Sequence, residues 1–184
     1  MSHRILPEKR PVTWVAIAGF MGTGKSRAGW ELSRRLSLTF IDTDRVIERV
    51  SCMRVAEIFE FYGEEVFRDY ETEIVRRCLK LDEVVISTGG GTVTRKVNRD
   101  LLTSRGPVVV LWASPETILK RTRRQRRPLL EVADPQARIR TLLDARRAAY
   151  EAVSTISVST DGRASREVIE EIIEKLMDWK AQQA

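Results

Sequence analysis

Residues 18–36 read AGFMGTGKSRAGWELSRRL, so that three glycines, a lysine and a serine stand directly before an amphipathic helical pattern. Glycine and serine are poor helix formers, and their place at the start of a helix needs a physical reason. The pattern G-x-x-x-x-G-K-[ST] is satisfied here by Gly19, Gly22, Gly24, Lys25 and Ser26. In this pattern backbone N–H groups enclose phosphate oxygens, the lysine reaches the β- and γ-phosphates, and the serine can ligate Mg²⁺. We therefore interpret the stretch as a phosphate-binding loop, with a bare strand-to-helix turn as the alternative.

Length and composition indicate one globular domain. The chain has 184 residues, of which 42% are hydrophobic and 32% charged. The longest strongly apolar run, residues 108–113, is too short to cross a membrane, and the first residues lack the apolar segment of a secretory signal. The two cysteines, Cys52 and Cys78, have no metal-binding or redox spacing. We expect a soluble, cytoplasmic protein.

The single histidine restricts the chemistry. His3 stands near the start of the chain, in a segment of about residues 1–10 that we expect to be a disordered tail. Catalysis by a histidine base, a Ser-His-Asp triad or an ordinary zinc site is therefore excluded. Any catalysis has to use carboxylates, lysine, arginine, backbone amides or a hard metal ion.

Strand and helix patterns alternate along the whole chain. Buried strands are predicted at residues 12–19, 38–44, 83–88, 106–114 and 154–160. Helices are predicted at residues 25–36, 45–81, 115–122, 136–152 and 165–182, the second of them broken near Tyr62-Gly63. This alternation is typical of an α/β domain in which helices cover both faces of a parallel sheet.

Two carboxylates stand at the end of the second predicted strand. Asp42 and Asp44 belong to the segment DTD, and open parallel sheets bind ligands at the carboxyl ends of their strands. Beside a phosphate site, one carboxylate would serve the metal ion and the other an acceptor hydroxyl. The alternative is an N-cap for the following helix, and one of the two residues can do both.

The segment STGGG, residues 87–91, follows the third predicted strand. Three consecutive glycines are costly in backbone entropy, which indicates close approach to a ligand; a bare turn is the alternative. The aspartate that often ends this strand in phosphate-loop enzymes is absent, since Ser87 and Thr88 stand there. Metal coordination therefore falls to Asp42.

Basic residues are concentrated in the segment KRTRRQRRPLL, residues 120–130. The formal net charge is +6, and 25 of the 32 basic residues are arginine. Such a run is typical either of a nucleic-acid-binding surface or of an arginine-bearing lid over ATP. No aromatic residue is interleaved with the arginines, which favours the lid.

Taken in order, the motifs GFMGTGKS, DTD, FR-x-x-E, GGG, RPLL and a final R-x-x-x-Y resemble those of shikimate kinases. The resemblance runs from about residue 14 to the last helix. It implies a three-layer α/β fold of the nucleoside-monophosphate-kinase type, with a five-stranded parallel sheet in the order 2-3-1-4-5. It also implies a lid at about residues 122–135 and substrate-binding helices at about 42–80. One departure is Ala148, which stands where the family usually has proline.

The resemblance also implies roles for individual residues. ATP would be bound by Gly22, Thr23, Gly24, Lys25, Ser26, Arg27, Arg121 and Arg127. Shikimate would be bound by Asp44, Arg68, Gly89, Gly90, Gly91 and Arg146. Mg²⁺ would be held by Ser26 and Asp42, and catalysis would rest on Lys25, Asp44 and Arg127. In this arrangement Arg68 and Arg146 clamp the substrate carboxylate, and Arg127, directly before Pro128, is the arginine of the lid.

The activity implied is ATP- and Mg²⁺-dependent phosphorylation of the 3-hydroxyl of shikimate, in the chorismate pathway to aromatic amino acids. The alternatives are another small-molecule kinase of this fold, such as a gluconate kinase, a catalytically idle kinase-like binding protein, or a nucleic-acid binder. We expect a monomer with no nucleic-acid or membrane partner.

Overall fold

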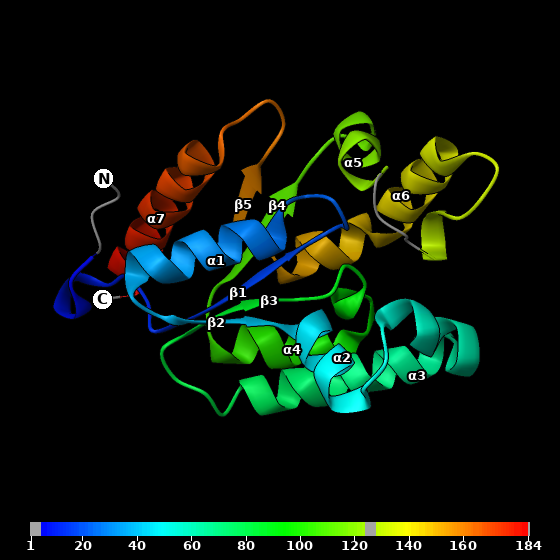
Figure 1. The fold of residues 1–184 in the computed structure, drawn as a ribbon. Helices are drawn as coiled ribbons and strands as arrows, with labels where there is room; N and C mark the ends of the chain where they lie inside the picture. Colours follow the sequence, from blue (N-terminus) through cyan, green and yellow to red (C-terminus); the bar gives the residue numbers. More distant parts are fainter. Residues whose placement is uncertain (1–4, 124–127, 184) are drawn as a thin grey trace.

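Five parallel strands form the central sheet of the computed structural model, which describes residues 5–123 and 128–183. The strands are β1 (Trp14–Gly19), β2 (Thr39–Asp42), β3 (Val84–Ser87), β4 (Val108–Trp112) and β5 (Ile156–Ser159). Their order across the sheet is β2-β3-β1-β4-β5, and every pair is parallel (Figure 1). The predicted fold class and strand order are confirmed.

The central strands are buried on both faces of the sheet, and both faces are therefore apolar. All six residues of β1 are buried, as are all four of β3. Alternate residues of β1 belong to two separate apolar clusters, one including Ala16 and the other Ile17. This is the pattern expected of a parallel sheet between two helical layers.

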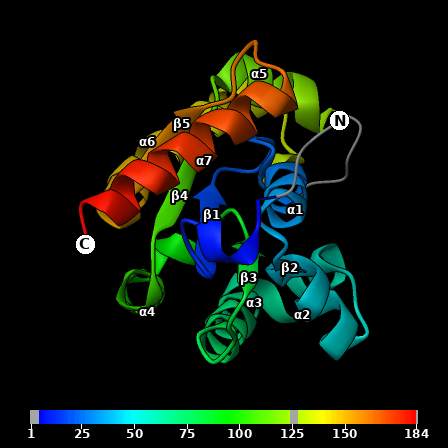
Figure 2. The same ribbon diagram turned by 90° about the vertical axis from the view of Figure 1, so that its left-hand side faces the viewer.

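In the part of the chain that the structure describes, two helices supply the layer on the Ile17 side, and five are on the other side (Figures 1 and 2). The first two are α1 (Lys25–Leu36) and α7 (Ser165–Ala181). The others are α2 (Thr43–Ser51), α3 (Val55–Cys78), α4 (Lys96–Arg105), α5 (Pro115–Thr122) and α6 (Pro135–Val153). Short 3₁₀ turns occur at Pro7–Lys9, Thr92–Thr94 and Pro128–Leu130.

The helical segment predicted at 45–81 consists of two helices and a kink. Cys52 has φ +56° and ends α2, because a residue in the left-handed backbone conformation cannot continue a right-handed helix. Gly63, with φ +81° and ψ 173°, interrupts α3, which confirms the predicted break. The sequence pattern did not reveal the first interruption, because cysteine is not a usual helix-ending residue.

Helix α4 was absent from the prediction, which assigned no element to residues 92–105. Its buried side chains are Asn98 and Leu102, one of which is polar. The residue before the helix, Arg95, also makes no side-chain capping hydrogen bond. An apolar stripe and a capping residue are the two usual signals of a helix, and α4 lacks a clear form of either.

The structure describes the chain from Ile5 onward, within the segment expected to be a disordered tail. The N–H of Ile5 donates to the carbonyl of Arg35 at 2.8 Å. Arg10 is buried, pairs with Glu83 at 2.7 Å and donates to the carbonyl of Ser37 at 3.0 Å. These contacts attach residues 5–10 to the end of α1 and to the residue before β3. His3 lies outside the described residues.

The parallel arrangement brings the segments after β1, β2 and β3 to one edge of the sheet. Gly19 ends β1, Asp42 ends β2 and Ser87 ends β3. Since β3 lies between β2 and β1, the phosphate loop, the DTD segment and the three glycines are neighbours there. Across residues 5–123 and 128–183, every helix is too short or too polar to span a lipid bilayer.

Candidate active site

The loop between β1 and α1 closes on the carbonyl oxygen of Phe20. That oxygen accepts hydrogen bonds from the N–H and hydroxyl of Thr23, at 3.3 and 2.8 Å, and from Nζ of Lys25 at 2.9 Å. Gly22 and Gly24 have φ of +78° and +94°, which glycine adopts at little cost. The loop therefore presents a buried ammonium and the start of α1, both of which attract anions.

Ser26 and Asp42 are joined directly. The hydroxyl of Ser26 donates to Oδ2 of Asp42 at 2.6 Å. The other oxygen, Oδ1, accepts from the N–H of Arg45 at 3.3 Å and caps α2. Of the two aspartates, Asp42 is thus the helix cap, and its second carboxylate oxygen leaves it a candidate metal ligand.

These two side chains suit Mg²⁺, which prefers oxygen ligands and keeps several of its waters. Within the described residues no cluster of three or more His, Cys, Asp and Glu side chains is arranged to hold a metal ion. A hydroxyl and a carboxylate beside a phosphate site are nevertheless sufficient for Mg²⁺, since phosphate oxygens supply further ligands. The residues present fit the ion.

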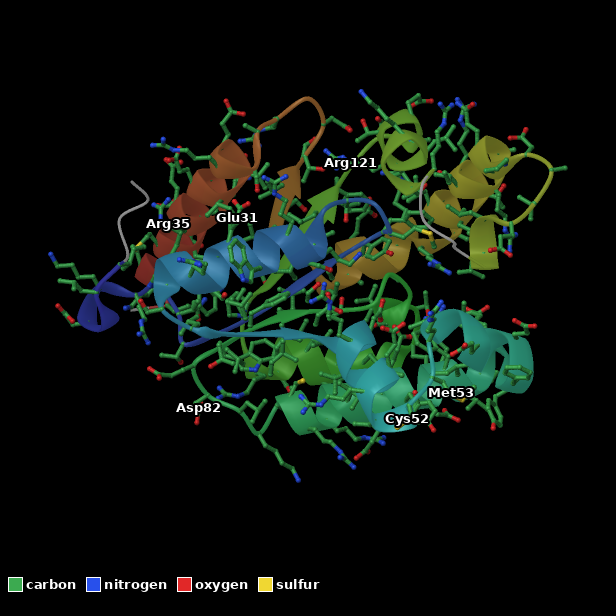
Figure 3. The ribbon with its side chains drawn as sticks, viewed as in Figure 1. Glu31, Arg35, Cys52, Met53, Asp82 and Arg121 are labelled. Carbon is green, nitrogen blue, oxygen red and sulfur yellow. The ribbon has the colours of Figure 1, made fainter. Side chains whose placement is uncertain are left out.

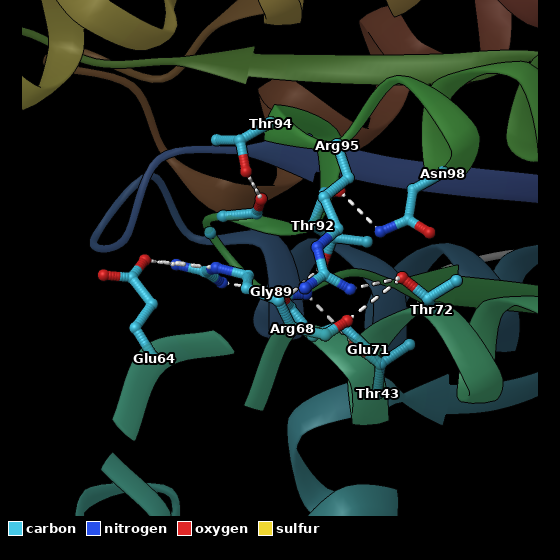
Figure 4. A network of polar contacts seen from close by, with 12 residues as sticks. Thr43, Glu64, Arg68, Glu71, Thr72, Gly89, Thr92, Thr94, Arg95 and Asn98 are labelled. Atoms are coloured by element: carbon cyan, nitrogen blue, oxygen red, sulfur yellow. Dashed lines mark hydrogen bonds and ion pairs between the residues drawn. The ribbon is translucent and has the colours of Figure 1, made fainter. Parts of the chain in front are cut away.

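The glycines after β3 bring two carboxylates together. A Cβ built on Gly89 would collide with Oε1 of Glu71 and lie 2.6 Å from Oδ1 of Asp44. The N–H of Gly89 donates to the hydroxyl of Thr43 at 3.0 Å, which fixes the start of α2 against this turn (Figure 4). Asp44, in the first turn of α2 and not in the strand as predicted, therefore lies at the glycine turn.

Arg68 is held between two carboxylates of its own helix (Figure 4). Its Nη1 lies 2.5 Å from Oε2 of Glu71, and its Nη2 lies 2.5 Å from Oε1 of Glu64. Oε1 of Glu71 also accepts from the hydroxyl of Thr92. Burial lowers the pKa of Arg68, but the charges and hydrogen bonds of Glu71 and Glu64 outweigh it, so that the pKa is raised above its ordinary value.

Arg146 reaches the same glycine turn from α6. Its Nη1 donates to the carbonyl of Gly90 at 3.1 Å, and the hydroxyl of Tyr150 donates to the same oxygen at 2.5 Å. The Arg146 guanidinium also lies over the ring of Phe20, 5.6 Å from its centroid. Burial raises the pKa of Tyr150 to about 12, so that it remains a donor at neutral pH.

A cavity of about 290 Å³ adjoins the other side of the phosphate loop. Arg121 lies at this side, donating to the carbonyl of Gly22 at 3.2 Å and to the hydroxyl and carbonyl of Thr160, both at 2.9 Å (Figure 3). The cavity is lined among others by Thr23, Gly24, Arg27, Arg121, Leu111 and Val168. Its mixed apolar and polar lining beside a phosphate loop suits the base and sugar of a nucleotide.

Comparison with known proteins accounts for this arrangement. Residues 21–177 match a family model described as shikimate kinase. The chain belongs to the shikimate kinase family. It is 55% identical to a shikimate kinase of Deinococcus radiodurans, over 96% of this chain and 89% of that one.

Solved structures agree with the family. A shikimate kinase from Acinetobacter baumannii in complex with shikimate has a TM-score of 0.89 and 35% identity, covering 92% of this chain and 95% of the other. A gluconokinase from Sinorhizobium meliloti has a TM-score of 0.62 over 95% of this chain and 97% of the other, but only 17% identity. That likeness shows the fold alone, so the gluconate kinase alternative has less support.

The structure brings most of the predicted site residues of this family member to one edge of the sheet. The glycine turn consists of Gly89, Gly90 and Gly91, and it is contacted by Asp44, Arg68 and Arg146. The phosphate loop includes the residues from Gly22 to Ser26. Arg27 is exposed, pairs with Glu31 at 3.0 Å and lines the cavity. Arg127 lies outside the described residues, so its predicted lid role stays a prediction.

Three neighbours of these residues were given no role by the sequence analysis. Glu71 ends the motif FR-x-x-E and Tyr150 ends R-x-x-x-Y, so both were marked by family motifs without a stated contact. Thr92, which donates to Glu71, carried no signal. The structure shows that all three hold the arginines or the glycine turn in place.

Proposed function

We propose that this chain transfers the γ-phosphate of ATP to the 3-hydroxyl of shikimate, giving shikimate 3-phosphate. The observation that carries the proposal is the contact between the phosphate loop and the arginine-lined glycine turn. A Cβ built on Gly90 would lie 3.1 Å from the backbone nitrogen of Met21. A nucleotide phosphate on the loop and an acid on the turn would therefore be neighbours.

The proposed roles follow from charge and position. Phosphoryl transfer is catalysed mostly by orientation and charge neutralisation. Lys25 would neutralise charge on the β- and γ-phosphates, and Asp44 would orient the acceptor hydroxyl and take its proton. Arg146 and Arg68, with the amides of Gly90 and Gly91, would bind the carboxylate. Arg127 would act from a lid at about residues 122–135.

Mg²⁺ is the proposed metal, and it would supply positive charge to the phosphate oxygens. Ser26 and Asp42 would hold it, with Asp42 acting through water. We also propose a single domain with α2 and α3 as substrate-binding helices, a monomeric state, a cytoplasmic location, and no nucleic-acid or membrane partner.

A coupled assay of ADP release tests the activity directly. Purified chain is incubated with ATP and Mg²⁺ and with shikimate, gluconate or no acceptor. The proposal requires turnover with shikimate that greatly exceeds the other two rates. Equal rates with and without shikimate would overturn it, and faster turnover with gluconate would assign the chain another acceptor.

Asp42→Asn should raise the Mg²⁺ concentration needed for half-maximal activity by about tenfold, the lower end of the effect of weakening a metal site. Asparagine caps helices as well as aspartate does, so α2 should remain intact. The measurement is a Mg²⁺ titration of the coupled assay at saturating ATP and shikimate. Asp69→Asn, at an exposed acid on α3 paired with Arg95, is the matched control. A larger change in the KM for shikimate than in the Mg²⁺ requirement would reassign Asp42 to the acceptor.

Gly91→Ala should weaken shikimate binding by about ten- to a hundredfold. A Cβ on Gly91 would overlap the guanidinium of Arg68, so Arg68 would have to shift away from the turn. Displacing one charge-assisted hydrogen bond of ~1.5–3 kcal/mol accounts for that range. Calorimetric titration with shikimate and separately with ATP makes the measurement. ATP affinity should be unchanged; an unchanged shikimate affinity would show that Arg68 does not bind the acceptor at this turn.

A further inference from the structure

Arg68, proposed above to bind the substrate carboxylate, already has carboxylate partners in the structure. Nε and Nη2 both donate to Oε1 of Glu64, at 3.2 and 2.5 Å, and Nη1 donates to Oε2 of Glu71 at 2.5 Å. Glu64 therefore takes the edge of the guanidinium formed by Nε and Nη2. This edge is one of the two that grip a carboxylate with parallel hydrogen bonds.

The two carboxylates differ in how firmly they are held. The side chain of Glu71 is 0% exposed and has a second partner in Thr92. The side chain of Glu64 is 45% exposed. Glu64 is also the residue directly after the kink at Gly63. A partly solvated carboxylate loses little stability when it leaves its ion pair for water. A buried carboxylate that loses its partner is left as an uncompensated charge in the protein interior, which is costly. Glu64 is thus the exchangeable partner of Arg68.

Other groups enclose the rest of the guanidinium. The rings of Phe59 and Phe67 have centroids 6.0 and 5.5 Å from Cζ of Arg68. The backbone of Gly91 lies so close to the guanidinium that a Cβ there would overlap it. Arg68 itself is only 5% exposed. An incoming carboxylate therefore gains the Nε–Nη2 edge by replacing Glu64.

We propose that Glu64 is a specificity-determining residue, which occupies the carboxylate-binding edge of Arg68 until a substrate carboxylate replaces it. This inference rests on the proposed function, because it takes shikimate as the acid that binds at Arg68. The formal charges of Arg68 and Arg146 are balanced by those of Glu64 and Glu71. A neutral polyol has no group to exchange for Glu64, whereas an acid restores the ion pair that it breaks.

The exchange has a cost in affinity that a substitution removes. Glu64→Gln should bind shikimate about three- to tenfold more tightly, the range expected for a partly exposed pair with a charge-assisted hydrogen bond. The methyl ester of shikimate, which carries no anionic group, should bind native chain and variant alike. Calorimetric titration with the acid and with the ester measures both affinities.

Glu65→Gln is the matched control. Glu65 neighbours Glu64 and is also ion-paired, but its partner is Arg95, at 2.7 Å. Its substitution removes the same charge from the same turn of helix and should change neither affinity by more than about twofold, the small effect of an exposed pair. Glu64→Ala, which cannot accept a hydrogen bond from Arg68, should change shikimate affinity in the same direction as Glu64→Gln. Thermal melting of each variant shows that the fold is retained.

Several results would overturn the inference. Unchanged or weaker shikimate binding by Glu64→Gln would mean that Glu64 does not compete with the substrate. An equal gain for acid and ester would mean that the effect does not depend on carboxylate exchange. The same gain in affinity for Glu65→Gln would mean that the effect comes from the change in net charge and not from the pair between Glu64 and Arg68. Failure of the proposed function has a different signature: native chain and Glu65→Gln would then neither bind shikimate nor turn it over.

Discussion

Lys25→Met should keep the fold and lose ATP-dependent phosphorylation of shikimate by about 10³-fold or more, the upper range for removing one preorganised charge-stabilising donor. Lys25 is 9% exposed, and its ammonium donates to the Phe20 carbonyl in the loop. It would lie where the phosphates gather charge during transfer. Methionine has a similar length without the charge, so packing should change little. The coupled assay measures the loss, and calorimetry should show shikimate still bound.

Lys96→Met is the comparison for Lys25→Met. Lys96 is exposed on α4 and pairs along its own helix with Asp100 at 2.7 Å. Its replacement should leave turnover within about twofold of native, since such surface pairs contribute little. Near-native turnover of Lys25→Met would show that the glycine-rich segment is only a turn, and would remove the basis of the phosphate site.

Asp44→Asn should lower kcat by about 10²- to 10⁴-fold, the usual contribution of a positioned acid–base group. Asp44 lies at Gly89, beside Glu71 and near the phosphate loop. Asparagine still donates and accepts hydrogen bonds but cannot take the proton of the acceptor hydroxyl. The change should therefore leave ATP affinity intact, as measured by calorimetry with ATP alone. Lost ATP affinity with intact shikimate affinity would move Asp44 to the nucleotide site.

The contrast with Asp42→Asn separates the two aspartates of the DTD segment. Each change removes one carboxylate charge, and both lie in the same three-residue segment. The first should alter the Mg²⁺ requirement and the second the rate at saturating Mg²⁺, because Asp42 bonds Ser26 whereas Asp44 lies at the glycine turn. Indistinguishable effects would mean that the segment acts through its charge alone.

The sheet and the phosphate loop were predictable because local patterns determine them. The three central strands, β1, β3 and β4, are short runs of mostly apolar residues. Gly22 and Gly24 occupy backbone conformations that favour glycine. An N-cap in the DTD segment was also within reach, since an aspartate at the start of a helical pattern is a usual capping residue. These features depend on neighbours in the chain, which the sequence displays directly.

The contacts that complete the acceptor site depend on distant neighbours. The pairs of Arg68 with Glu64 and Glu71 have ordinary helical spacing, so their formation is unsurprising. The complete burial of Glu71 is not visible in that spacing, because Thr92 and Gly89 produce it from 21 and 18 positions further along the chain. Helix α4 was missed for a related reason. One of its two buried side chains is the polar Asn98, which donates a hydrogen bond to the carbonyl of Thr92 and so breaks the apolar pattern.

The carbonyl of Gly90 also bears on the order in which the two substrate sites arise during folding. It is bound by Arg146 and Tyr150, which follow it by 56 and 60 positions in the chain. Closing a long loop costs entropy before its contacts form. The hydrogen bonds that close the phosphate loop on Phe20 join residues 20–25, so this loop can take shape while α6 is still undocked. A folding chain should thus form its phosphate loop before its acid site, and shikimate should stabilise only chains in which both ends of this bond have met.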